Sequence, residues 1–170
     1  MKYTNEERLA FARSHKFSLP NDEIHACAFI HRLAEVGGDG FGWVRDEEMR
    51  LIEMPHAGNV VIEKEVVIRA FVTVDRAVQG STVIREGTKI DHHCHIAHNV
   101  QIGKHNTLAN GCIIEGSCIV GDYNTFGAGV IVQRKVKIGN NCKFGSGAVV
   151  VKDVEDNSVM VGNPARRLEK

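Results

Sequence analysis

The stretch Ile90-Asp91-His92-His93-Cys94-His95-Ile96-Ala97-His98-Asn99-Val100-Gln101-Ile102 carries an aliphatic residue at every sixth position, and this spacing decides the fold. Stepping by six from Ile84 to Val150 meets only apolar residues, and a small or β-branched residue lies two positions before most of them. A helix cannot keep a period of six on one face, but short strands of period two that alternate with turns can. Three hexads close one triangular turn of about 18 residues, and stacked turns bury a continuous apolar column. The sequence therefore predicts an all-β fold, a parallel β-helix of hexapeptide repeats shaped as a triangular prism.

The same frame extends toward the N-terminus. It holds over residues 62–74, slips by four residues over 75–80, and returns more weakly over 24–36. We expect the slip to be a loop that leaves the prism. Glycine often follows the apolar residue, which suits a turn that needs either a positive φ or a close backbone approach.

Three segments follow from this frame. Residues 1–20 are predicted to be a short N-terminal helical segment, because Thr4 and Glu7 can form a capping box. Residues 21–150 are predicted to form the β-helix, with a loop insertion at 37–57 that contains a hairpin-like excursion. Residues 151–170 lose the repeat and are predicted to form an irregular C-terminal tail.

Composition narrows the classes of function. The chain has 170 residues, 43% of them hydrophobic, with 21 Lys and Arg against 21 Asp and Glu. A net charge of zero argues against nucleic acid or an anionic membrane surface as the main partner. No apolar run is long enough for a membrane span, and the N-terminus lacks the apolar core of a secretion signal. We therefore expect a cytoplasmic protein.

Four of the five cysteines share one position in the repeat. Cys94, Cys112, Cys118 and Cys142 each lie two residues before the aliphatic position, where side chains point inward. Buried thiols behave as small hydrophobic groups, so we interpret these four as core residues. Cys94 and Cys112 would stack on adjacent turns, but a reducing cytosol argues against a disulfide.

The histidine cluster supplies the candidate chemistry. His95 precedes the inward Ile96 and should point outward, and His98 should lie at a corner of the prism. Gly116 follows His98 by one turn of the repeat and should stack about 4.8 Å away. A histidine beside an exposed glycine amide can serve acyl transfer, with the imidazole as general base and the N–H as oxyanion donor. The alternative is a solvated or metal-trapping surface.

Several motifs here resemble a known family. Ile96-Ala97-His98-Asn99-Val100-Gln101-Ile102-Gly103 resembles the active-site hexads of the lipid A pathway acyltransferases, most closely UDP-3-O-(3-hydroxyacyl)glucosamine N-acyltransferase. Asp39-Gly40-Phe41-Gly42 and Val74-Asp75-Arg76 match the same family in the same order, and the resemblance covers roughly residues 37–130. It implies a left-handed helix and a homotrimer with active sites between subunits. It also implies that His98 is the general base and Gly116 the oxyanion donor.

The chain departs from that family in three ways. It has room for neither the N-terminal uridine-binding domain nor the C-terminal helical extension, and Lys135 stands where the family has a second histidine. The tail, with Gly162-Asn163-Pro164-Ala165, resembles coenzyme A-dependent sugar acetyltransferases instead. The resemblance therefore leaves two donors open, an acyl-CoA and an acyl carrier protein.

The leading hypothesis is an acyltransferase that moves an acyl group, acetyl first, from a thioester to an amino or hydroxyl group of a sugar. The expected acceptor is a nucleotide-linked amino sugar, and no permanently bound cofactor or metal is expected. We assign His95, Asn99 and Asp75 to substrate binding. We assign Gly127, Gly145, Lys152 and Arg166 to the CoA site.

Three alternatives remain beside it. One is a lipid A-type N-acyltransferase that uses acyl carrier protein. Another is a zinc-dependent β-helical carbonic anhydrase, in which His93 and His98 would need a third ligand such as His56. The last is a non-catalytic assembly subunit.

Overall fold

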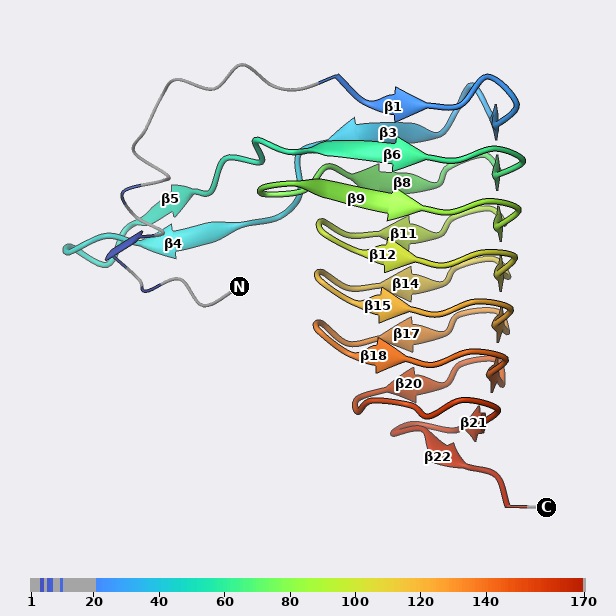
Figure 1. The fold of residues 1–170 in the computed structure, drawn as a ribbon. Helices are drawn as coiled ribbons and strands as arrows, with labels where there is room; N and C mark the ends of the chain where they lie inside the picture. Colours follow the sequence, from blue (N-terminus) through green and yellow to red (C-terminus); the bar gives the residue numbers. More distant parts are fainter. Residues whose placement is uncertain (1–3, 5, 8–9, 11–20, 170) are drawn as a thin grey trace.

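The computed structural model describes residues 4, 6–7, 10 and 21–169, and its strands stack into the three faces of a triangular prism (Figure 1). Face A contains β1 (Glu23–Ile24), β6 (Asn59–Ile62), β9 (Ser81–Ile84), β12 (Gln101–Ile102), β15 (Ile119–Val120) and β18 (Lys137–Ile138). Face B contains β2 (Phe29–Ile30), β7 (Val67–Ile68), β10 (Lys89–Ile90), β13 (Thr107–Leu108), β16 (Thr125–Phe126), β19 (Lys143–Phe144), β21 (Val159–Val161) and β22 (Arg166–Arg167). Face C contains β3 (Glu35–Gly38), β8 (Thr73–Asp75), β11 (His95–Ile96), β14 (Ile113–Ile114), β17 (Ile131–Val132) and β20 (Val149–Val150). The predicted all-β parallel solenoid is confirmed.

The coil is left-handed. In Figure 1 the strands of face A cross the front toward the right, those of face C return behind toward the left, and each turn lies below the one before. This winding confirms the hand that the family resemblance implied. It is an exception to the right-handed rule for parallel crossovers.

The register explains the period of the sequence. Gln101 pairs with Ile119 and His95 with Ile113, a step that keeps the same hexad position above itself in every turn. Between β7 and β10 the step is longer, because Val67 pairs with Lys89. The additional residues form the loop 76–80 at the edge where face C meets face A, which we call the C–A edge. The predicted slip in the frame is therefore confirmed as a loop.

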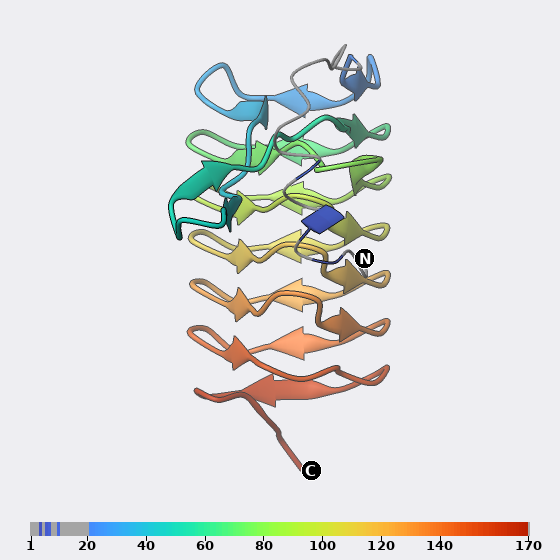
Figure 2. The same ribbon diagram turned by 90° about the vertical axis from the view of Figure 1, so that its left-hand side faces the viewer.

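The insertion contains a short hairpin. β4 (Trp43–Arg45) pairs with β5 (Leu51–Glu53) in antiparallel fashion, with Trp43 opposite Glu53. The hairpin leaves the stack after β3 and lies outside the upper turns, as Figures 1 and 2 both show. It stands beside the C–A edge.

The interior is the predicted apolar column. The repeat aliphatics from Ile62 to Val150 are almost fully buried and form one continuous cluster. Cys94, Cys112, Cys118 and Cys142 are buried and free, which confirms their interpretation as core residues. Burial raises the pKa of the Cys118 thiol to about 11, so this group stays protonated at neutral pH.

The structure shows whether the glycine after each apolar residue serves a positive φ or a close backbone approach. Gly103, Gly121, Gly127, Gly139 and Gly145 do not have positive φ; a Cβ on any of them would lie 3.1 Å or less from an atom of the next turn. These five positions therefore require glycine because the next turn approaches closely. The left-handed conformation falls two residues later in the turn and is adopted by non-glycine residues such as His93, Asn99 and His105.

One row of the interior is polar. Asn106 Nδ2 donates to the Gly121 carbonyl at 2.9 Å, and Asn106 Oδ1 accepts from the Asn124 amide at 2.8 Å. Asn124 repeats the pattern one turn further, donating to the Gly139 carbonyl at 3.0 Å and accepting from the Cys142 amide at 2.7 Å. The buried amides therefore replace backbone hydrogen bonds that the turns leave unmade.

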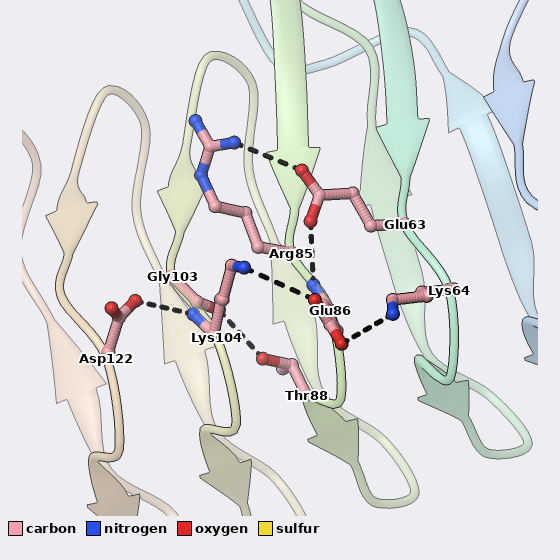
Figure 3. Close-up of polar contacts among 8 residues, drawn as sticks. All are labelled: Glu63, Lys64, Arg85, Glu86, Thr88, Gly103, Lys104 and Asp122. Carbon is pink, nitrogen blue, oxygen red and sulfur yellow. Dashed lines mark hydrogen bonds and ion pairs between the residues drawn. The ribbon is translucent and has the colours of Figure 1, made fainter.

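A second ladder covers the outside of the edge between faces A and B (Figure 3). Glu86 accepts from Lys64 at 3.0 Å and from Lys104 at 3.2 Å, so one carboxylate joins three turns. Glu63 pairs with Arg85 at 3.1 Å. Because these pairs are exposed, each contributes only on the order of 0–1 kcal/mol.

The C-terminal segment differs from the expected irregular tail. Val154 bridges to Ile138, and β21 pairs in parallel with β19, so residues 151–161 add a further partial turn to the stack. This turn is shorter than the others, since Phe144 pairs with Met160 rather than with a residue two positions later. β22 then reverses and pairs antiparallel with β21.

The N-terminal prediction can be compared only in part. Thr4 N–H donates to Glu7 Oε2 at 2.6 Å and Glu7 N–H donates to Thr4 Oγ1 at 3.2 Å, the reciprocal pair of a capping box. The remainder of the predicted helical segment lies outside the described residues, apart from 6 and 10. Among the described residues, no helix is long and apolar enough to cross a membrane.

Candidate active site

A cavity of about 630 Å³ lies between the C–A edge and the insertion. The insertion provides its apolar wall with Phe41, Trp43, Val44 and Met54. The edge provides the polar wall, and all five residues assigned to catalysis and substrate binding line it: Asp75, His95, His98, Asn99 and Gly116. The stacking of turns thus brings together residues that are far apart in the sequence.

His98 lies in the turn after β11, and Asn99 beside it has a φ of 61°. His98 Nδ1 lies 3.2 Å from Asn99 Oδ1, so Nδ1 is the donor of this pair, and in the neutral imidazole Nε2 carries the lone pair. Asn99 Oδ1 also accepts from the Val78 amide at 3.0 Å, and Asn99 Nδ2 donates to the Gln79 carbonyl at 2.8 Å. Asn99 therefore ties the His98 ring to the loop 76–80.

Gly116 faces His98 one turn further along. A Cβ built on Gly116 would lie 2.7 Å from His98 Nε2, so no side chain fits there while the imidazole keeps its place. Arg134 occupies the position of Gly116 in the following turn, and its backbone N–H donates to Glu115 Oε2 at 3.0 Å. For the Gly116 N–H the residue equivalent to Glu115 is Ala97, which has no side-chain acceptor. Within the described residues the Gly116 N–H accordingly makes no hydrogen bond, and Gly116 lines the cavity beside His98.

Asp75 and His95 form a second polar pair. His95 Nδ1 lies 2.7 Å from Thr73 Oγ1, and His95 Nε2 lies 3.7 Å from Asp75 Oδ2. Burial raises the pKa of Asp75 to about 6, although nearby His98 opposes the shift. Burial lowers the pKa of His95, so this imidazole is uncharged at neutral pH.

The structure places a further histidine beside His98 that the sequence pattern did not assign to the acyl-transfer site. His56, between the hairpin and β6, is 2% exposed, and its ring meets that of His98 at a centroid distance of 5.4 Å and an angle of 68°. The sequence named His56 only as a third zinc ligand. His93, the other ligand in that hypothesis, stacks on Phe71 at 5.0 Å on the edge between faces B and C, away from His98 in the same chain. The described residues contain no group of three side chains suited to a metal ion.

The residues assigned to the CoA site are dispersed. Gly127 and Gly145 lie on the edge between faces B and C, and Arg166 lies in β22, so none of them lines the cavity of a single chain. Lys152 lies on the C–A edge, in one column with His98, Gly116 and Arg134, because Val132 pairs with Val150. Lys135, which replaces the family's second histidine, lines the cavity.

The repeats themselves match a known family. Residues 81–116 and 117–152 each match the family described as bacterial transferase hexapeptide (six repeats). This match covers 72 of the 170 residues, from β9 to β20.

Relatives share more than the repeats. UDP-3-O-acylglucosamine N-acyltransferase of Christiangramia forsetii is 56% identical over 130 residues, which cover 76% of this chain and 38% of that protein. The enzyme of the same name from Methylococcus capsulatus is 45% identical over 82 residues, covering 48% of this chain and 23% of that protein. The chain therefore spans less than half the length of these relatives. The resemblance of the central region to this family is confirmed.

A solved structure supports the same architecture. The UDP-N-acetylglucosamine acyltransferase of Arabidopsis superimposes with a TM-score of 0.77 at 27% identity, over 88% of this chain and 51% of that one. The overall fold is thus similar to that of an acyltransferase.

Proposed function

We propose that the protein is an acyltransferase that moves an acyl group from a thioester to the amino group of a nucleotide-linked amino sugar. The observation that carries this proposal is the close approach of His98 Nε2 to Gly116 in one cavity, together with a Gly116 N–H that makes no hydrogen bond among the described residues. General-base catalysis and a preorganised oxyanion donor are the two aids that acyl transfer needs.

The reaction then proceeds in two steps. His98 Nε2 removes a proton from the acceptor nitrogen as that nitrogen attacks the thioester carbonyl. The carbonyl oxygen becomes an oxyanion, which accepts a hydrogen bond from the Gly116 N–H. Collapse of the tetrahedral intermediate breaks the carbon–sulfur bond. The leaving thiolate takes the proton from the His98 imidazolium, so the base returns to its starting state and no net proton is lost.

The relatives support nitrogen as the acylated atom, since both are named N-acyltransferases of a UDP-linked acylglucosamine. Asp75, His95 and Asn99 surround His98 in the cavity and supply acceptors and donors for sugar hydroxyls. His95 Nδ1 is engaged by Thr73, so Nε2 is the ring atom left to donate to or accept from a hydroxyl group, according to the tautomer.

The column below His98 supports a donor with a phosphate-bearing arm. Gly116, Arg134 and Lys152 follow His98 at successive turns, so Lys152 lies about 14 Å away at 4.8 Å per turn. If the thioester of the donor lies at Gly116, its extended arm would place the phosphate near the side chains of Arg134 and Lys152. We retain acetyl-CoA as the first donor, with Gly127, Gly145 and Arg166 as further contacts from a neighbouring subunit. Acyl carrier protein is the alternative.

The outer faces support assembly as a homotrimer. Ile113, Ile131 and Val149 form an apolar row on the outside of face C, and Ile119 continues it on face A, whereas face B carries Lys89, Thr107, Thr125 and Lys143. An apolar surface on both sides of one edge suits burial against other copies of the chain. The site would then lie between subunits.

The test is an acyl-transfer assay with two donors. Acetyl-CoA and a long-chain acyl carrier protein are each incubated with the protein and with UDP- and dTDP-linked amino sugars, and free thiol and acylated sugar are both measured. Transfer from acetyl-CoA supports the proposal as stated. Transfer only from acyl carrier protein replaces the donor, and absence of transfer from either donor to any amino sugar contradicts the proposal.

A further inference from the structure

The motif Asp39-Gly40-Phe41-Gly42 encloses a buried imidazole that the proposed reaction does not use. A Cβ on Gly40 would lie 2.7 Å from His56 Nε2, and one on Gly42 would lie 3.2 Å from His56 Cε1. The Gly42 carbonyl also accepts from the Met54 amide at 2.8 Å, which draws the two strands of the insertion together over the ring. The two glycines are therefore needed where the chain closes over His56.

His56 is held without charge. It is 2% exposed, and its Nε2 has no hydrogen-bond partner among the described residues. Burial lowers its pKa, and the neighbouring His98 and Arg76 act in the same direction against the opposite effect of Asp39. A hydrogen bond to the Met54 backbone fixes the other side of the ring. An unpartnered buried polar atom costs about 1–3 kcal/mol, a cost that an apolar side chain would avoid.

The ring of His56 contacts the catalytic ring directly. The 5.4 Å centroid distance and 68° angle describe an edge-to-face pair with His98. Asn99 Oδ1 holds His98 through Nδ1 at 3.2 Å. The hydrogen bond restrains one ring nitrogen, and packing of a second ring against the imidazole restricts its remaining rotation about χ1 and χ2.

We propose that His56 is a positioning residue, which holds the His98 imidazole at the angle where Nε2 faces Gly116. The inference rests on the proposed function, because His56 acts only through His98. It also gives the insertion a part in catalysis beyond forming a wall. His56 must stay uncharged in this role, since a second cation at this distance would oppose the imidazolium that His98 becomes during turnover.

The kinetic test compares three variants. His56→Ala removes the ring, and we expect kcat to fall about 10- to 100-fold with KM changed less than about threefold, because misplaced catalytic groups lose rate at this scale. His56→Phe keeps a ring in the same place and should recover most of kcat. His105→Ala is the matched control, since His105 also stacks on an aromatic ring, that of Tyr123 at 5.4 Å, on another edge of the prism. Equal kcat for wild type and His56→Ala would overturn the proposal.

A second measurement needs no turnover. The ring resonances of His98 in a ¹⁵N-histidine-labelled protein report its tautomer and its mobility. We expect one Nδ1–H form in wild type, in His56→Phe and in His105→Ala, and exchange-broadened resonances in His56→Ala with unchanged circular dichroism. If the His98 resonances of folded His56→Ala match those of wild type, His56 does not position the ring. This readout remains decisive even if no acyl transfer is found, so the two proposals can fail separately.

Gly42→Ala perturbs the same contact from the opposite side. Its Cβ would press on Met54 Cβ at 3.1 Å and His56 Cε1 at 3.2 Å. If Gly42 acts through His56, Gly42→Ala should lower kcat in the wild-type background by severalfold and leave it nearly unchanged in His56→Ala. Fully multiplicative losses in the double variant would contradict the proposed route.

Discussion

His98 lies in a turn and is only partly buried, so its removal should change chemistry more than packing. We expect His98→Ala to keep the circular dichroism and thermal midpoint of wild type while lowering acyl transfer about 10²- to 10⁴-fold. His95→Ala should have a milder effect, because His95 bonds to Thr73 and faces Asp75. Near-normal activity of His98→Ala, with loss in His93→Ala or His105→Ala instead, would show that the base is a different histidine.

A substitution at Gly116 tests the contact between Gly116 and His98 Nε2 directly. Alanine keeps the backbone N–H, but its Cβ would meet His98 Nε2 at 2.7 Å. The imidazole must then move away from the oxyanion donor, and we expect Gly116→Ala to lower kcat at least about 10²-fold. Gly111→Ala is not a suitable control because of its positive φ, whereas Ala97→Gly leaves the contact untouched and should retain activity. A fully active Gly116→Ala would show that His98 does not act from this position.

The buried carboxyl group of Asp75 should make the unfolding free energy of the protein depend on pH. Burial raises its pKa in the folded protein to about 6, well above that of an exposed aspartate, so the folded protein binds this proton more tightly than the unfolded chain. The associated stability is present below about pH 4 and is lost as the pH rises through 6. Asp75→Asn avoids the buried charge, so its unfolding free energy at pH 8 should exceed that of wild type by about 1–3 kcal/mol, as measured by chemical denaturation. The difference should shrink at pH 4.5, and a difference independent of pH would contradict the buried-charge explanation.

At the residue scale, period and spacing predicted much of the candidate site. His98 and Gly116 are separated by one turn of three hexads, so their contact could be anticipated from the step of the coil alone. Asp75 is harder to place, because the loop 76–80 breaks the frame just after it. His56 could not be placed at all: it lies in an insertion without periodicity, and its contact with His98 depends on how that insertion folds back.

At the level of single turns, the buried asparagine ladder makes a strong prediction. Asn124→Ala leaves the Cys142 amide and the Gly139 carbonyl without partners inside the prism. We expect a loss of about 2–4 kcal/mol in unfolding free energy, measured by chemical denaturation. Thr125→Ala changes the adjacent, outward residue and should stay within about 0.5 kcal/mol of wild type. Equal stability of the two variants would mean that the ladder is not needed.

The elements could be predicted wherever the step between turns stays constant. From Ile84 to Val150 the hexads alone fix β9 to β20. The partial turn at residues 151–161 was missed because its step is two residues shorter, which shifts Val154 and Met160 out of the frame. The hairpin in the insertion was expected, but its position beside the C–A edge depends on tertiary contacts that no local pattern carries.

At the scale of the whole molecule, the outer faces predict the assembly. We expect a sedimentation mass close to three times 18.7 kDa at micromolar concentration. Ile113→Asp and Ile119→Lys place charges on the apolar faces beside the C–A edge and should shift the mass toward one chain, with loss of activity. Lys143→Asp on face B is the matched charge change and should leave the mass unchanged. A wild-type mass of one chain would contradict the trimer.

The reversal at β22 has a consequence for self-association. A stack of parallel strands presents an open row of N–H and C=O groups at its last turn, which is a template for another chain. Here β22 covers the edge of β21 with two arginines, Arg166 and Arg167, running in the opposite direction. An incoming prism would meet the wrong strand polarity and a pair of positive charges. On face B the reversal therefore disfavours the addition of another parallel strand beyond β21.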